Sequence, residues 1–261
     1  INMIDPYHLE AYGKTTVNYN RDIEIFPVLR AMFEKISGTC PYKSPTDMGV
    51  NMVGDCIFDD EAVSAAAKQE IVRRYYHSLC SLRQGMSEQS EVTKLELIMN
   101  KLGISKEIRP VVDAAILRAE ETGAPAVAIQ MPDGAIITGK TTPLLGASAA
   151  VILNALKHLA GIAHDIALIS PAVIEPIQEL KTNVMGNHNP RLHTDEILIA
   201  LSISAVTNPV AALAMKQIEK LRSCEAHSTV ILSRVDENVF QKLGINMTCE
   251  PKYQTKKLYH R

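Results

Sequence analysis

Apolar residues recur at helical spacing through the first half of the chain. Between 23 and 36 the spacing predicts a helix that Gly38 ends, with Pro27 in its first turn. Asp59 suits an N-cap, and after it a second helix is indicated by one apolar stripe, made of Val63, Ala67, Ile71, Tyr75, Leu79 and Leu82.

Two shorter helices follow in the same region. One covers 91–102 and is closed by Gly103, and the next begins at Pro110 and is closed by Gly123. Proline suits the first helical position, and glycine suits the left-handed residue that follows the last turn. We therefore expect residues 23–122 to form a mainly helical subdomain, with an extended linker over 1–22 before it.

The pattern changes at Ala124, where short apolar runs replace the long stripes. The runs AVAIQM and AIIT flank Pro132-Asp133-Gly134 and predict a β-hairpin. Alternating helices and buried strands predict an α/β fold, in which residues 123–261 form a layered α/β/α subdomain with a small mixed sheet. The other expected strands are 166–169, 228–233 and 245–248. The other expected helices are 144–161, one after Pro171, two over 194–221, and one from its N-cap Asp236 to Gly244.

An uncharged stretch over 197–215 approaches the length of a membrane span. Polar residues interrupt its middle, and Asn208-Pro209 is typical of a helix start, with Asn208 as cap and Pro209 at the first position. We interpret the stretch as two buried helices and expect no membrane partner.

The composition is that of a globular protein with a core, since 46% of the 261 residues are hydrophobic and 21% are charged. A net charge of -2 lacks the basic excess of a nucleic-acid-binding protein, so no such partner is expected. The five cysteines include no C-x-x-C pair and are interpreted as reduced thiols in a cytoplasm. The chain opens at Ile1 with sequence typical of the middle of a protein, which suggests a missing N-terminal part.

The segment from Gly134 to Thr141 satisfies the phosphate-loop pattern G-x-x-x-x-G-K-[ST]. Its interior, Ala-Ile-Ile-Thr, prefers an extended strand to a loop that wraps its N–H groups round an anion. We therefore expect a hairpin strand that ends in a Gly-Lys-Thr turn. Lys140 and Thr141 remain candidate ligands for an anion at the start of the following helix.

His193, Asp195, Cys224 and His227 form the second candidate group, because His-x-Asp and Cys-x-x-His are spacings that could hold a metal. The competing interpretation is structural: Asp195 belongs to a helix start, and Cys224 and His227 lead into a strand. No metal site is predicted. His193 and His227, with Asp195, are instead the candidate catalytic residues, because both histidines lie where loops meet core elements.

The loop over 38–55 is rich in glycine and proline and carries polar residues between turn formers. Asp47 and Asn51 are its candidate ligand-binding residues. Plain turn chemistry is the alternative interpretation of the same residues.

Several long segments resemble the bacterial uncharacterised protein family 0371. They are NMIDPYHLEAYGKTTVNYNRDIEIFPVL, YKSPTDMGVNM, NPRLHTDEILIALSISAVTNP, CEAHSTVILS and CEPKYQTKKLYHR. The resemblance covers nearly the whole chain. It implies a parent about twice as long, of which this is the C-terminal half, and an N-terminal half with a phosphate-loop-like turn. It supplies no reaction and no catalytic residues.

Two functions are consistent with the sequence, and no cofactor is assigned for either. The chain is part of an enzyme that acts on a nucleotide or phosphorylated small molecule, or it is a non-catalytic assembly or ligand-binding module. The expected partners are the missing N-terminal half, a second copy of the chain and a phosphorylated small molecule. Convergence of Lys140, His193, Asp195 and His227 on one cavity would favour the enzyme, and their dispersal would favour the module.

Overall fold

The computed structural model describes residues 20–41 and 60–254. They belong to two compact units, one made of residues up to 78 together with 87–108, and the other of residues 79–86 together with 109 onwards.

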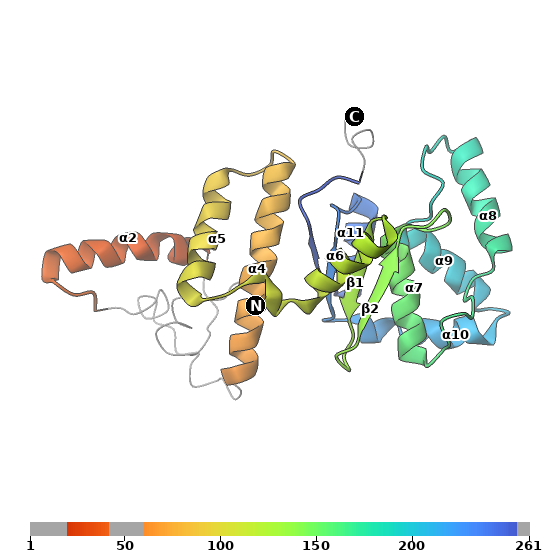
Figure 1. Cartoon of the computed structure of the whole chain (residues 1–261), viewed down its shortest axis with the longest axis horizontal. Helices are drawn as coiled ribbons and strands as arrows, with labels where there is room; N and C mark the ends of the chain where they lie inside the picture. Colours follow the sequence, from red (N-terminus) through yellow and green to blue (C-terminus); the bar gives the residue numbers. More distant parts are fainter. Residues whose placement is uncertain (1–19, 42–59, 255–261) are drawn as a thin grey trace. The chain divides into compact units, whose positions relative to one another are not determined.

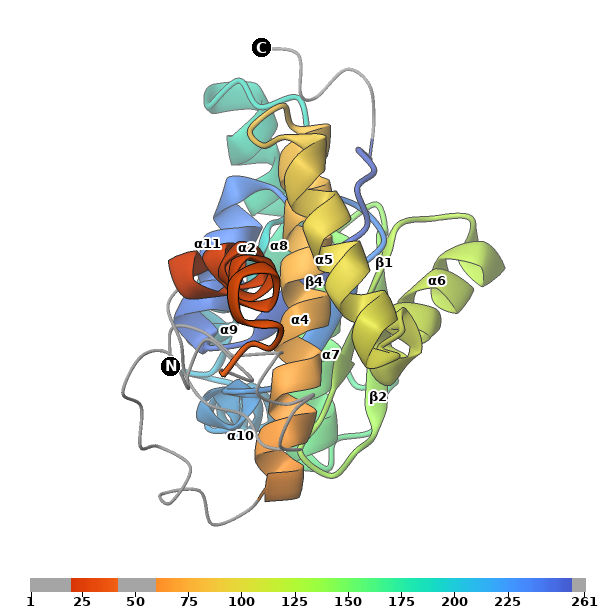
Figure 2. The same ribbon diagram turned by 90° about the vertical axis from the view of Figure 1, so that its left-hand side faces the viewer.

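The first unit is helical, as the apolar stripes predicted. It contains α2 (Asn20–Ser37), most of α4 (Asp60–Arg83), α5 (Gln89–Leu102) and a short 3-10 turn, η2 (Lys106–Ile108). Helices α4 and α5 lie side by side and antiparallel (Figures 1 and 2), and the Tyr75 hydroxyl is 3.2 Å from the Glu96 carboxylate between them. Pro27 lies inside α2, not in its first turn, because the helix begins at Asn20.

The second unit is built on a four-stranded mixed sheet in the order β2-β1-β3-β4. Strands β1 (Ala126–Gln130) and β2 (Ile136–Lys140) form the predicted antiparallel hairpin, whose turn has Gly134 at φ +85°. Strand β3 (Glu225–Ser228) runs antiparallel to β1 and parallel to β4 (Asn246–Cys249).

Helices cover both faces of this sheet, which confirms the layered α/β/α fold. Side chains alternate along β1, so Ala128 packs against α6 (Pro110–Thr122), while Val127 and Ile129 pack into the larger core around α7 (Ala147–Ala160). Figure 2 shows α6 and α7 on opposite sides of β1 and β2. The remaining elements are α8 (Pro171–Glu179), the π-helical turn η3 (Leu180–Val184), α9 (Thr194–Ser204), α10 (Pro209–Met215), the 3-10 turn η4 (Ile218–Leu221) and α11 (Arg234–Leu243).

The phosphate-loop pattern is a strand, as predicted. Residues 136–140 are β2, and Gly139 serves the packing of α7 on it: a Cβ at Gly139 would lie 2.3 Å from the backbone nitrogen of Val151. Only glycine lets the helix backbone come so close to the strand.

Two strand predictions were wrong. Residues 166–169 form no strand, although Leu168 and Ile169 are buried in an irregular segment. The strand expected at 228–233 is Glu225–Ser228, and the chain turns after it because the Ser228 hydroxyl donates to the Val230 carbonyl (2.7 Å).

The start of α11 also differs from the prediction. Its N-cap is Ser233, whose hydroxyl accepts from the backbone N–H of Asp236 at 3.2 Å. Asp236 therefore lies in the first turn, and its carboxylate is directed to another helix, α9.

The uncharged stretch over 197–215 is divided between α9 and α10, as predicted, but the two helices are only partly buried, since Ile199 and Leu213 are exposed. Asn208 caps α10, with its side-chain oxygen 3.0 Å from the Val210 nitrogen, and Pro209 opens the helix. In the part of the chain that the structure describes, no helix combines the length and the apolar character that crossing a bilayer requires.

A buried arginine joins α6 to the sheet. Arg109, which is 1% exposed, precedes α6 and donates to the Glu225 carboxylate, the Ala226 carbonyl (3.0 Å) and the Thr248 hydroxyl (3.2 Å). The guanidinium thus spans β3 and β4, and these partners compensate the cost of burying its charge.

Candidate functional site

A cavity of about 370 Å³ lies in the second unit where three helices begin. Gly146 precedes α7, His193 precedes α9 and Ser233 precedes α11, and all three residues line the cavity. Thr141 and Ser228, at the ends of β2 and β3, also contribute to its wall. The fold therefore gathers helix N-termini, each with a partial positive charge, at one end of the sheet.

Asp236 holds His193 in this wall. The carboxylate Oδ2 lies 3.1 Å from His193 Nδ1 and accepts from the Ser233 hydroxyl at 2.8 Å. The other oxygen, Oδ1, accepts from the backbone N–H and the hydroxyl of Thr194 at 2.9 and 2.8 Å. Asp236 is 8% exposed and so has four hydrogen bonds to compensate its burial.

These contacts set the charge of both groups. Burial raises the pKa of Asp236, but the hydrogen bonds from His193, Thr194 and Ser233 outweigh it and hold the pKa below its ordinary value. The hydrogen bond to Asp236 raises the pKa of His193, against the opposing effect of burial. The pair is therefore ionised over the range where the histidine is protonated.

The same bond fixes which nitrogen of His193 can act as a base. An ionised carboxylate only accepts hydrogen bonds, so Nδ1 carries the proton and the neutral ring has its lone pair on Nε2. Among the described residues, Nε2 of His193 has no hydrogen-bond partner, and the residue lines the cavity. This arrangement suits a general base or, when protonated, a general acid.

The rest of the polar wall contains Arg191 and His188 beside neutral amide and hydroxyl side chains and backbone N–H groups. Arg191 lines the cavity and is anchored by a bond from its Nε to the Thr142 carbonyl at 2.9 Å. Gly146 has no side chain to cap α7, whose first-turn residues Ala147 and Ser148 line the cavity. Asp236 is the one acid among the described residues of the lining, and its carboxylate is already engaged.

Lys181, which is 4% exposed, stabilises the backbone next to His193. Its Nζ donates to the Arg191 carbonyl at 2.8 Å and to the Glu196 carboxylate at 2.7 Å. The same carboxylate oxygen accepts the His193 backbone N–H at 2.8 Å. The loop that carries Arg191 and His193 is thereby fixed to the first turn of α9.

The structure brings only some of the candidate residues together. His193 and Thr141 line this cavity, whereas Lys140 lines a different cleft. His227 is fully buried in β3, with Nδ1 2.8 Å from the Thr248 hydroxyl and Nε2 3.4 Å from the Glu250 carboxylate.

Asp195 lies in the first turn of α9, where its carboxylate accepts the Glu196 N–H at 2.8 Å. Asp47 and Asn51 lie outside the described residues. The convergence of Lys140, His193, Asp195 and His227 on one cavity is therefore not observed. Within the described residues, no group of three or more His, Cys, Asp or Glu side chains is placed to hold a metal ion.

Sequence reasoning missed Asp236, Ser233 and Arg191 as site residues. Ser233 and Asp236 fit the capping pattern of a serine followed three residues later by an acid, which could have moved the expected N-cap to Ser233. Nothing local links Asp236 to His193, which lies 43 positions earlier in the chain.

Two family models match the chain. One is described as the C-terminal part of the domain of unknown function DUF1846 and matches residues 107–259; the other is its N-terminal part and matches residues 1–103. The chain belongs to this family. The DUF1846 chain is also similar to UPF0371 proteins of Streptococcus thermophilus and of Streptococcus pyogenes serotype M5, with 57% and 56% identity over 261 residues.

These comparisons confirm the resemblance to family 0371, but they do not support the expectation that the chain is only a C-terminal half. The whole of this chain aligns with each relative but spans only 53% of the relative's length. The match of residues 1–103 to the N-terminal model means that the chain does not correspond to the C-terminal region alone. A separate N-terminal half as partner therefore has no support from these matches.

Proposed function

We propose that the DUF1846 chain binds a phosphorylated small molecule in the cavity beside α7, α9 and α11, and that His193 transfers a proton to or from it. The observation that carries this proposal is the His193–Asp236 pair at 3.1 Å, with Nε2 left for a ligand in the cavity wall. A carboxylate that orients a histidine and raises its pKa is a recurring arrangement for acid–base catalysis.

The charge of the lining favours an anionic ligand. Arg191 and protonated His193 supply positive charge, and the N-terminus of α7 adds N–H donors that no side chain caps. The carboxylate of Asp236 faces four donors, so its negative charge is balanced locally. A phosphate group placed at Gly146 and Arg191 would meet donors on two sides.

The size of the cavity narrows the ligand class. About 370 Å³ is near the lower end of the range for small-molecule sites, which suits a phosphorylated metabolite better than a dinucleotide. In this arrangement the phosphate is held at the helix N-terminus, and the reacting hydroxyl or water lies at Nε2 of His193. We place this activity in the cytoplasm, in keeping with the free thiols of Cys40, Cys80, Cys224 and Cys249.

Calorimetric titration of the full chain with inorganic phosphate at pH 6 tests the binding step. We expect saturable binding that His193→Gln weakens at least fivefold, because it removes one charge from the wall. His77→Gln is the control, since His77 is exposed and lies outside the cavity. Equal phosphate affinity in the wild type and His193→Gln would contradict the proposal.

A turnover screen against phosphorylated metabolites then tests the catalytic step. The expected result is a pH–rate profile with an apparent pKa above 6.5 that His193→Gln abolishes; the rate falls at low pH where His193 accepts the proton and at high pH where it donates it. Phosphate binding without turnover of any compound would support a non-catalytic ligand-binding module instead.

The non-catalytic module is the second candidate: the dispersal of the four expected residues favours it, whereas the His193–Asp236 pair favours the enzyme. Exposed apolar residues on and after α9 (Ile199, Ile203 and Val206) give such a module a surface for self-association. Light scattering of the full chain measures this directly, and a monomer at all concentrations would exclude the homo-oligomer.

A further inference from the structure

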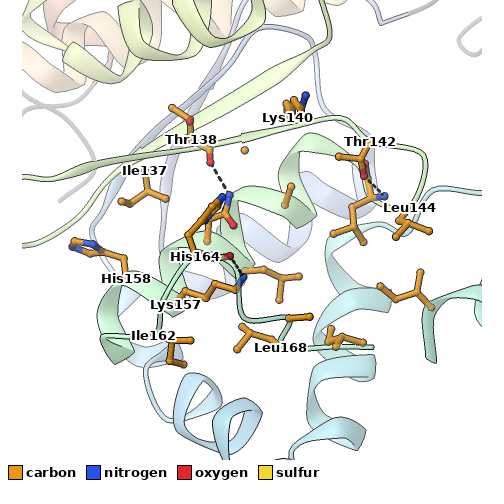
Figure 3. A pocket seen from close by; sticks show the side chains of 18 of the residues that line it. Ile137, Thr138, Lys140, Thr142, Leu144, Lys157, His158, Ile162, His164 and Leu168 are labelled. Carbon is orange, nitrogen blue, oxygen red and sulfur yellow. Dashed lines mark hydrogen bonds between the residues drawn. The ribbon is translucent and has the colours of Figure 1, made fainter. Parts of the chain in front are cut away.

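A second cleft, of about 680 Å³, lies along the outer edge of β2 (Figure 3). Helix α7, the segment 162–169 and the start of α8 complete its walls. Most of the wall is apolar, through Leu144, Leu153, Ile162, Leu168, Ile169 and Ile174. The cleft is thus different in character from the polar cavity at His193.

The polar groups of this cleft are cationic or neutral. No acidic residue is among the described residues that line it. Arg118 and His158 are already paired, at 3.2 Å with Glu121 and at 2.7 Å with Asp133. The two lysines of the lining are not: within the described part of the chain, neither Lys140 nor Lys157 forms an ion pair.

Lys157, on α7, is one of the two lysines that line the cleft. Its Nζ donates to the backbone carbonyl of His164 at 2.8 Å. In the view of Figure 3, Lys157 lies in the middle of the labelled side chains, whereas Lys140 and His158 lie toward their edges. Partial burial lowers the pKa of Lys157, against the opposing charge of Asp165. An anion beside Nζ would replace the hydration that burial removes.

An added peptide strand is a poor occupant of this edge. Residues 136, 138 and 140 of β2 turn their backbone groups away from β1, because 137 and 139 are the positions that bond to it. Of these outward groups, the Thr138 carbonyl already accepts from the Asn154 side chain at 2.9 Å. A new strand would have to displace Asn154 at the centre of the ladder, which favours a small molecule over a peptide.

We propose that this cleft binds a small carboxylate with an apolar body, with its head group at Lys157 and its body against the apolar wall. The charge of Lys157 beside apolar lining residues matches the single charge of a monoanion, and the cleft volume lies well within the range of small-molecule sites. The site is separate from the His193 cavity, so its occupancy does not depend on the acid–base function.

Titration of the full chain with decanoate, below its micellar concentration, tests the proposal. Saturable one-to-one binding is expected, with decanol at least tenfold weaker because it lacks the charge. Lys157→Met, which keeps an apolar stem, should weaken decanoate about tenfold and leave decanol unchanged. Lys216→Met is the matched control, an exposed lysine outside the cleft, and should bind decanoate as the wild type does.

Ala167→Phe gives an independent test that does not disturb a hydrogen bond. Ala167 is exposed in the irregular segment that lines the cleft, so a phenyl ring can occupy the cleft without entering the core. This variant should lose decanoate binding while retaining the wild-type unfolding midpoint. Non-saturable binding, equal affinity for decanol, tighter binding of an acidic strand-forming peptide, or unchanged decanoate affinity in both variants would each overturn the proposal.

Discussion

Replacing Asp236 by Asn separates the structural and chemical roles of the His193 wall. The substitution keeps the shape of the side chain but turns one acceptor oxygen into an NH₂ donor. The amide oxygen must stay at the Oδ1 position, because the Thr194 backbone N–H can only donate, and the NH₂ group then lies at the Oδ2 position, where His193 and Ser233 meet a neutral donor in place of a charged acceptor. With the amide nitrogen at the Oδ2 position, His193 Nδ1 must become an acceptor, and the lone pair leaves Nε2.

The expected loss of stability follows from these contacts. A hydrogen bond to a charged acceptor is worth about 1 kcal/mol more than one to a neutral acceptor. The loss of this difference over the contacts of Asp236, which is 8% exposed, is partly offset because Asn buries no charge, so the substitution should cost about 2 kcal/mol. Ser233→Ala is the matched control, because it removes the cap of α11 and one bond to Oδ2 but leaves the His193–Asp236 contact. We expect Ser233→Ala to lower the free energy of unfolding by about 1 kcal/mol.

The pH dependence distinguishes the ionic part of this loss. The folded pKa of His193 is raised above 6.5, so its contribution is complete below pH 6.5 and is lost as the pH rises through the folded pKa. The folded pKa of Asp236 is lowered below 3.8, so its contribution is present above pH 3.8 and is lost as the pH falls through the folded pKa. The difference in the free energy of unfolding between wild type and Asp236→Asn should be largest between pH 3.8 and pH 6.5 and smaller at pH 9.

Denaturant unfolding at several pH values measures the stability difference, and NMR titration of the imidazole measures the pKa of His193. In Asp236→Asn that pKa should fall, and the neutral ring should carry its proton on Nε2. An unchanged His193 pKa and tautomer in this variant would refute the assignment of Asp236 as the group that orients the ring.

Substitutions at three further positions test the packing of the second unit by denaturant unfolding. Gly139→Ala should destabilise by about 3 kcal/mol, because its Cβ would lie 2.3 Å from the Val151 nitrogen, whereas Gly146→Ala, with no atom nearer than 3.6 Å, should cost less than about 1 kcal/mol. Arg109→Ala should lower the free energy of unfolding by about 3–5 kcal/mol, because Glu225 and the carbonyls of β3 and β4 lose their shared donor. Arg109→Lys should recover only part of this stability. Equal stability of the Ala and Lys variants would contradict a role for the forked guanidinium.

The elements that the sequence predicted well are those whose signals are local. Gly103, Gly123 and Gly244 close helices with φ of +63°, +63° and +72°, as glycine does after a last turn. The Pro-Asp-Gly turn likewise defined the β1–β2 hairpin. Each of these signals depends on a few adjacent residues, so no knowledge of the tertiary fold was needed.

The misplaced third strand shows where local reasoning fails. The run STVILS is more apolar than Glu225–Ser228, yet the ladder with β1 and β4 forms on the latter. Glu225 is tolerated at the start of β3 because Arg109, which lies 116 positions earlier, pairs with it. A contact of that separation has no signature in a single sequence, and the same is true of His193 with Asp236.

The phosphate-loop-like pattern contributes to the site through packing, although it binds no phosphate in the manner of that motif. Gly139 lets α7 lie directly on β2, and this close contact fixes where α7 begins, at the wall of the His193 cavity. The loop between β2 and α7 separates the His193 cavity from the cleft along β2, since Thr141 lines the cavity and Thr142 lines the cleft. A substitution in this loop changes both walls, so variants that probe one ligand site must be checked against the other. Lys157 and His193 lie outside the loop and are therefore the residues that report on each site separately.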